Sequence, residues 1–247
     1  IFLIASISPS LTTNLFLPFL KNSIENFSLN PWDNFLLTNN EINSFPYGLI
    51  MVIAYFPISF FGNLIDKFIY DFNFIELGFK LTSLLFDYFL LIFLSLITSN
   101  KSKKLLIFCF WLSPIAIYTN YIHGQLDIVP IALLICSVFF IKNNNYSLSG
   151  LILSLSISSK FSMLIALPFF IIYIYKRRGI QQELFKFIVS LLILNLLTFI
   201  PYLSSISFWE MVLKTKELDR IYTIFISYGS NLRLYVLPVV YIFSLYL

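Results

Sequence analysis

The chain has 247 residues, of which 59% are hydrophobic, 19% aromatic and only 11% charged, with a mean hydropathy of +0.87. Soluble domains carry about 25% charged residues, so 16 basic and 12 acidic side chains are too few to cover a water-facing surface of this size. The composition therefore predicts an all-α, polytopic transmembrane helical bundle and excludes a soluble enzyme, a nucleic-acid-binding module and a disordered tail. The chain starts at Ile1 and stops at Leu247 inside apolar runs, which predicts a single module over 1–247, truncated at both ends.

Residues 9–46 form the first polar stretch, which we expect to be the first external loop. Apolar side chains between positions 15 and 24 recur at helical spacing, which predicts an amphipathic helix in the membrane interface. The carboxylates of this loop are candidates for a general base that acts on a hydroxyl group. They are Asp33, Glu41 and Glu25. Trp32 is an interfacial anchor that would hold the neighbouring Asp33 near the membrane surface.

Apolar runs predict spans at 47–64, 77–98, 105–120, 128–142, 147–175 and 186–203, with a truncated span at 234–247, and so about seven to nine spans in all. Residues 204–233 form a second long polar stretch, the predicted second external loop. In its amphipathic helix, Trp209, Val212 and Leu213 are expected to face the membrane, while Glu210 pairs with Lys214 at i,i+4 spacing.

The basic clusters determine only part of the topology. Lys176, Arg177 and Arg178 predict a cytoplasmic loop, with residues 204–233 on the other side. The run 147–175 leaves the upstream sides open, because its 29 residues make a helix of about 43 Å, too long for one straight crossing and short for two. One crossing places the lysines of 101–104 outside and 121–127 inside. Two crossings exchange these sides, and 9–46 is then outside only if 47–64 does not cross.

Two ionisable residues lie within a single predicted span, although a charged residue at a helix centre costs about 2.5–3.5 kcal/mol. Lys80 and Asp87 are seven residues apart and therefore share nearly the same helical face. The sequence favours a structural contact to a neighbouring helix, and the alternative is support of a polar cavity.

The segment from Ser113 to Asp127 holds the only histidine of the chain and several hydrogen-bonding groups between two apolar runs. His123 and Asp127 would share a face in a helix, although Gly124 favours a turn. We expect a binding role for His123, Gln125 and Asp127, with an ordinary interfacial loop as the alternative. Lys160 lies at the break of its span, where it either snorkels to the interface or binds a lipid phosphate.

Other chemistry lacks a sequence signal. Cys109 and Cys136 lie in apolar runs without metal or disulfide spacing, so we expect small buried side chains. The chain has no glycine-rich phosphate loop, no zinc-type ligand spacing and no Ser/His/Asp elbow.

Four segments in order resemble the polytopic glycosyltransferases of the C superfamily, which use a polyprenyl-phosphate-linked sugar. They are NPWDNFLLTNNEINSFPYGLIM, KLTSLLFD, SPIAIYTNYIHGQLDIVPIAL and SGLILSLSISSKFSMLIALPFF. The similarity is strongest to glucosyl- and mannosyltransferases that extend lipid-linked glycans. Five features carry it: the aromatic-proline element Phe45–Tyr47, Asp87 within the next span, the polar box His123–Asp127, Lys160 ahead of a Leu-Pro span, and the loop 204–233.

The resemblance implies an inverting transfer of a hexose to a lipid-linked or polymeric glycan acceptor, with a loop carboxylate as the base. It implies polyprenyl (dolichyl or undecaprenyl) phosphate as the sugar carrier, no cofactor, no divalent metal, and membrane lipids rather than nucleic acid as partners. It adds Lys214, Lys216 and Arg220 as candidate phosphate contacts. The protein would then reside in a bacterial inner membrane or the endoplasmic reticulum.

One departure from the family keeps other functions open. The family usually has an aspartate just after the first span, where this chain has Thr13 and Asn14. Either Asp33, Glu25 or Glu41 serves as the base, or the protein is not active in the usual way. The alternatives are a transporter or lipid flippase, in which the intramembrane charges line a pathway, and a non-catalytic membrane subunit.

Overall fold

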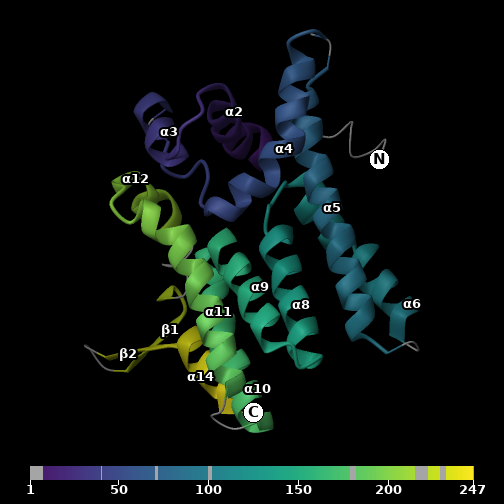
Figure 1. Cartoon of the computed structure of the whole chain (residues 1–247), viewed down its shortest axis with the longest axis vertical. Coiled ribbons are helices and arrows are strands. Elements are labelled where there is room, and N and C mark those ends of the chain that lie inside the picture. Colours follow the sequence, from purple (N-terminus) through teal and green to yellow (C-terminus); the bar gives the residue numbers. More distant parts are fainter. Residues whose placement is uncertain are drawn as a thin grey trace.

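The computed structural model describes residues 8–39, 41–69, 72–99, 102–178, 182–214, 222–228 and 232–246. Most of these residues lie in helices, as Figure 1 shows, and the predicted helical bundle is confirmed in this respect. The sequence did not predict the antiparallel hairpin of strands β1 (Phe225–Tyr228) and β2 (Leu232–Tyr235).

The first polar stretch folds into a helical cap. A π-helix, η1 (Thr12–Phe16), continues into α2 (Leu17–Glu25), and α3 (Pro31–Asn39) follows. The ring of Phe19 in α2 stacks on that of Phe45 at 4.4 Å between centroids, and both rings are fully buried. The predicted helix is therefore present, but its apolar face packs against protein rather than lying free to contact lipid.

Two long helices follow, α4 (Leu49–Asp66) and α5 (Phe74–Ile97), which pack side by side as a hairpin (Figure 1). Asp66 caps the start of α5, because its carboxylate accepts hydrogen bonds from the backbone N–H groups of Phe74 at 2.6 Å and Ile75 at 2.9 Å.

The predicted span 105–120 is a bent pair of short helices. Its first arm is α6 (Lys103–Leu106) with η3 (Ile107–Trp111), and its second is α7 (Pro114–Ile117) with η4 (Tyr118–Ile122). The arms meet at 47°. The break lies before Pro114, which has no N–H to continue the helix and holds Ser113 in an extended conformation (ψ 127°).

The run 147–175 consists of two helical arms that run in opposite directions. α8 (Ile128–Lys142) and α9 (Tyr146–Ser159) form a hairpin, and the chain reverses after α9 into η5 (Phe161–Ala166) and α10 (Leu167–Arg178). The reversal occurs because Lys160 has an extended backbone (φ −145°, ψ 117°). α11 (Gln182–Phe199), ending in η6 (Ile200–Tyr202), then packs along α9. Of the two topologies left open by the sequence, this geometry corresponds to the one with two passes.

The predicted count of seven to nine spans is not confirmed. Among the described residues, Leu49–Asp66, Phe74–Ile97 and Gln182–Tyr202 are long and apolar enough to cross a membrane, and the bent pair makes up to four. α8, α9 and α14 (Val236–Tyr246) are apolar but shorter, with 15, 14 and 11 residues.

The second polar stretch is only partly helical. It contains α12 (Ile206–Phe208) and η7 (Trp209–Leu213), and the β1–β2 hairpin occupies its later part. Val212 is buried in the protein core, whereas Trp209 is 41% exposed. No ion pair between Glu210 and Lys214 occurs in the part of the chain that the structure describes. The prediction for this stretch is therefore wrong for Val212 and for the ion pair.

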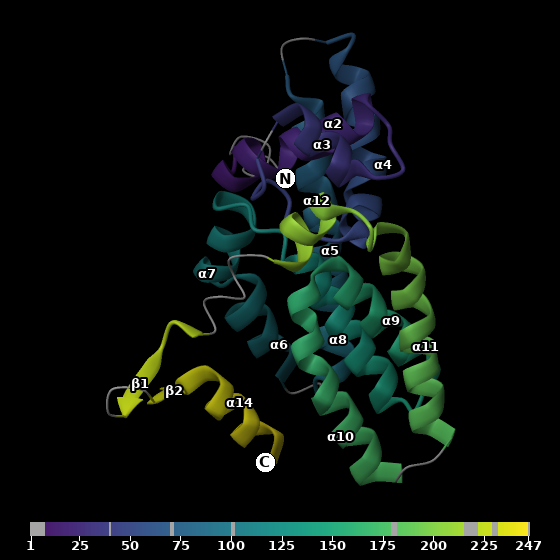
Figure 2. The same cartoon turned by 90° about the vertical axis from the view of Figure 1, so that its left-hand side faces the viewer.

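The helix ends form two levels (Figures 1 and 2). The C-terminal ends of α5, α8 and α10 lie toward one end of the molecule, and α2, α3 and α12 lie toward the other. The α7–α8 connection and the break between α9 and η5 lie at the level where the cap begins. Asp127 and Lys160, which lie in these two segments, meet at this level.

Candidate functional site

Three polar side chains from distant parts of the chain meet where α8 and α9 approach the cap. The Lys160 ammonium lies 2.8 Å from Asp127 Oδ1, and the Tyr47 hydroxyl donates a hydrogen bond to the same oxygen at 3.1 Å. The Lys160 ammonium also lies 5.4 Å from the centre of the Tyr47 ring. We refer to Tyr47, Asp127 and Lys160 as the central cluster.

Burial differs within the central cluster. Lys160 is 8% exposed, whereas the Asp127 side chain is 32% exposed. A buried ammonium needs a paired anion, and Asp127 supplies it. The lysine therefore does not snorkel away from the protein in this structure, and the carboxylate keeps one face open.

Close backbone contact between two segments positions this cluster. The Gly48 N–H donates to the Ser159 carbonyl oxygen at 2.9 Å. A Cβ atom at Gly48 would lie 2.1 Å from the Ser158 carbonyl oxygen, so a larger residue does not fit here. The element Phe45–Tyr47 is thereby held directly against the extended residue Lys160, although more than 100 residues separate them.

The His123–Gly124 turn forms the adjoining wall, against the first polar stretch. The Leu11 N–H donates to the His123 carbonyl at 3.3 Å, and the Thr12 hydroxyl donates to the Gly124 carbonyl at 3.2 Å. Gly124 has φ +78°, which favours glycine, and Asp127 is the N-cap residue of α8. The turn suggested by Gly124 is therefore present, and His123 and Asp127 do not share a helical face.

His123 and Gln125 lie beside the cluster without contacting it directly in any hydrogen bond between described residues. The His123 ring stacks on Tyr118 with 6.0 Å between centroids. The backbone N–H of Gln125 donates to the Thr119 carbonyl at 2.9 Å. Thr13 and Asn14, at the positions where the family usually has its aspartate, directly follow the Thr12 contact.

Asp87 forms a second polar site, between α5 and the bent pair. Its Oδ2 accepts hydrogen bonds from the Trp111 indole N–H at 3.0 Å and the Tyr121 hydroxyl at 2.6 Å, and a cavity of about 510 Å³ adjoins it. Lys80 lies elsewhere and pairs with Glu76 at 2.8 Å, with both side chains buried. The structural contact expected of Asp87 is thus present, and its partners are the two arms of the bent pair.

The first-loop carboxylates occupy different surroundings. Asp33 uses both oxygens: Asn30 donates to Oδ2 at 2.6 Å and the Ser205 hydroxyl donates to Oδ1 at 2.7 Å. Glu25 is exposed and lies 3.9 Å from Lys21. Glu41 is exposed and accepts a hydrogen bond from Ser44 at 3.1 Å. The structure therefore joins Asp33 to the start of α12 and does not join any of the three to the central cluster.

The second-loop cations are described only in part. Lys214 is exposed and follows η7, and its backbone N–H donates to the Trp209 carbonyl at 2.8 Å. Lys216 and Arg220 lie outside the described residues. Of the two cysteines, Cys136 is buried as expected and Cys109 is exposed.

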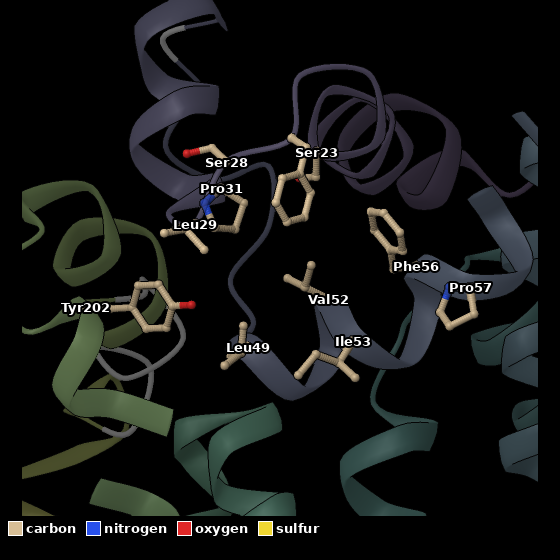
Figure 3. A pocket seen from close by; sticks show the side chains of 11 residues that line it. Ser23, Ser28, Leu29, Pro31, Leu49, Val52, Ile53, Phe56, Pro57 and Tyr202 are labelled. Atoms are coloured by element: carbon tan, nitrogen blue, oxygen red, sulfur yellow. The ribbon is translucent and has the colours of Figure 1, made fainter. Parts of the chain in front are cut away.

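An apolar groove of about 350 Å³ lies between the cap, α4 and the end of α11 (Figure 3). Its wall includes Phe27, Leu29, Leu49, Val52, Ile53 and Phe56. The Tyr202 hydroxyl points into it, as Figure 3 shows. Leu49 is the first residue after Gly48, so the groove starts within one turn of the central cluster along the chain.

Sequence reasoning singled out Asp127 and Lys160 separately but did not predict that they pair, nor that Tyr47 joins them. One sequence feature could have indicated this cluster: Tyr47, Asp127 and Lys160 each lie in one of the segments that carry the family resemblance. The contacts of Asp87 with Trp111 and Tyr121 had no sequence signal beyond the cost of an intramembrane carboxylate.

The comparison with known families agrees with this arrangement. The sequence profile of glycosyltransferase family 87 matches residues 45–244 of the 247. No curated protein and no solved structure gives a significant match to the chain. The match includes Tyr47, Asp127 and Lys160, and the expected likeness to polytopic C-superfamily glycosyltransferases is confirmed. The chain belongs to glycosyltransferase family 87.

Proposed function

We propose that this protein transfers a hexose from a polyprenyl-phosphate sugar to a lipid-linked or polymeric glycan acceptor, with inversion at the anomeric carbon. The observation that carries the proposal is the convergence of Tyr47, Asp127 and Lys160, together with an apolar groove whose wall begins at Leu49, two residues after Tyr47. A polyprenyl-phosphate sugar has the matching parts: an apolar tail, an anionic phosphate and a polar sugar.

Lys160 suits the phosphate. The Lys160 ammonium donates to Asp127, and its positive charge is of the right sign to attract a phosphate oxygen. A cation in a largely buried site stabilises the negative charge that develops on a leaving phosphate. Lys214, Lys216 and Arg220 are further candidate phosphate contacts in the second polar stretch, and His123 and Gln125 are candidate sugar contacts beside the turn.

The apolar groove suits the isoprenoid tail. Its walls are almost entirely hydrocarbon, and it follows α4 away from Gly48. Ile53, 55% exposed, lies on its rim. An Ile53→Trp replacement would fill the groove and should raise KM for a long-chain donor about tenfold, a loss of about 1.4 kcal/mol. A two-isoprene donor should be unaffected, and Ile92→Trp, on α5 outside the groove, is the matched control. Equal effects of both replacements on the long-chain donor would contradict this assignment.

The charges predict how the molecule sits in the membrane. Basic residues belong to the helix turns near one end of the molecule, which the positive-inside rule places in the cytoplasm: Lys103 in α6, Lys142 in α8, Lys176 in α10 and Lys186 in α11. The cap and α12 then lie on the opposite side, with the central cluster below them. The membrane is a bacterial inner membrane or the endoplasmic reticulum, and the substrate arrives laterally among the lipids.

Transfer is tested with the purified full-length protein in nanodiscs. Radiolabelled polyprenyl-phosphate mannose and polyprenyl-phosphate glucose are the donors, and extracted lipid-linked oligosaccharides are the acceptors. We expect labelled acceptor and an equal amount of released polyprenyl phosphate. Solute uptake by proteoliposomes without transfer from either donor would contradict the proposal and favour a transporter.

A further inference from the structure

The hydrogen bonding of Asp127 distinguishes it from the other carboxylates near the cap. Lys160 and Tyr47 both contact Oδ1, at 2.8 and 3.1 Å. Within the described ranges, Oδ2 has no hydrogen-bond donor, and the side chain is 32% exposed. The carboxylate is thus held in place by one oxygen, and the partly exposed side chain leaves the other oxygen for a substrate.

The first-loop carboxylates have different geometry. Both Asp33 oxygens accept hydrogen bonds, at 2.6 and 2.7 Å, and one of the donors, Ser205, also caps α12 through the Phe208 N–H at 3.0 Å. Asp33 therefore joins two loops of the protein. Glu25 and Glu41 are exposed on the cap and contact only nearby side chains.

Resting on the proposed transferase function, we propose that Asp127 is the catalytic general base, in place of a carboxylate from the first loop. The fold brings the first loop and Asp127 together, because Thr12 contacts Gly124, three residues before Asp127. The Thr13–Asn14 segment, where the family's aspartate is sought, and the Asp127 carboxylate therefore flank the same turn. A carboxylate from the turn serves where positions 13 and 14 of the loop have none.

The chemical step balances with the groups present. The acceptor hydroxyl oxygen forms a bond to the anomeric carbon of the donor while the bond from that carbon to the phosphate oxygen breaks. The hydroxyl proton passes to Asp127 Oδ2, and the electron pair of the broken bond leaves with the polyprenyl phosphate. Lys160 pairs with Asp127 before the step and faces the new phosphate charge after it. Tyr47 orients the carboxylate through Oδ1.

The test compares Asp127→Asn with Asp33→Asn in full-length protein in nanodiscs, using polyprenyl-phosphate mannose and polyprenyl-phosphate glucose as donors. Loss of a general base lowers kcat by about 10² to 10⁴-fold. We expect that loss for D127N, with donor binding, measured by protection against thermal unfolding, unchanged. D33N should keep kcat within about threefold of the unmodified protein. Asp127→Glu should restore part of the activity, because it returns a carboxylate.

Each other result has a distinct meaning. Turnover by D127N within about threefold of the unmodified protein overturns the base assignment and leaves the transferase function standing. Equal loss of donor binding and turnover in D127N makes Asp127 a binding residue and also overturns the assignment. A large kcat loss in D33N alone returns the base to the first loop. An unmodified protein that transfers from neither donor refutes the proposed function, and the base assignment with it.

Discussion

At the residue scale, three aspartates differ in which of their carboxylate oxygens accept hydrogen bonds from the protein. Asp33 has both oxygens bonded, Asp87 accepts two hydrogen bonds at Oδ2, and Asp127 receives its two contacts at Oδ1. Asp87 is 4% exposed, whereas the Asp127 side chain is 32% exposed. Only the combination of a fixed oxygen and an open one suits proton transfer to a substrate, and among these three residues Asp127 has it.

Gly48 holds the central cluster together, and its replacement should show this. Gly48→Ala places a Cβ atom 2.1 Å from the Ser158 carbonyl oxygen, so the backbone before Lys160 must move. We expect a loss of about 1–3 kcal/mol in stability, as for other overpacked sites, together with a clear fall in sugar transfer. Thermal unfolding in detergent and the transfer assay measure the two effects. A G48A protein with unchanged unfolding temperature and turnover would show that this contact is not needed.

The sequence made individual residues of this site visible but did not show how they meet. Asp127 and Lys160 stood out because ionisable groups near apolar runs are costly. Their pairing depends on the extended backbone at Lys160 and on the approach of Gly48, which are tertiary features of segments far apart in the chain. Asp33 was favoured as a base from its place near the membrane surface, and its bond to Ser205 follows only from the packing of α3 against α12.

At the element scale, breaks in the helices place the polar groups. The apolar runs predicted the positions of α4, α5, α8 and α11 to within a few residues, because a hydrophobic run of this length is typical of a helix. The pattern indicated a break at Lys160 but left open whether α9 and α10 make one crossing or two, since both helices are apolar and only the backbone at Lys160 divides them. It also did not predict the β1–β2 hairpin, which lies in a stretch with short alternating apolar residues.

Asp87 accepts hydrogen bonds from both arms of the bent pair and so holds them against α5. Two replacements at this position should distinguish the role of its acceptor oxygen from the role of its negative charge. Asp87→Asn keeps a carbonyl oxygen for the Trp111 and Tyr121 donors, so we expect nearly unchanged stability. Asp87→Leu leaves both donors unpaired, which costs about 1–3 kcal/mol for each group. Thermal unfolding of the two variants in the same detergent measures the difference. Equal destabilisation by D87N and D87L would show that the negative charge, rather than the acceptor oxygen, holds the bent pair.

At the scale of the whole molecule, charge and shape agree on one orientation. The C-terminal ends of α5, α8 and α10 lie toward one end, where basic residues follow or belong to these helices, while the cap and α12 lie toward the other. α4 leaves the level of the central cluster on the cap side, and α5 returns past it toward the basic end (Figure 1). Residues 9–46 can therefore contact the 121–127 turn, although the apolar helix α4 lies between these two segments in the sequence.

Cysteine labelling tests this orientation directly. In protein with Cys109 and Cys136 replaced by serine, single cysteines are introduced at Asn143, in the α8–α9 connection, and at Asn39, at the end of α3, both of which are exposed. A membrane-impermeant maleimide should label Asn39→Cys from outside intact cells or from the lumen of the vesicles. It should label Asn143→Cys only from the cytoplasmic side, because the basic ends of helices are retained there. Labelling of both positions from one side would contradict this orientation, because an odd number of crossings must separate residues 39 and 143 if the cap and the α8–α9 connection face opposite sides.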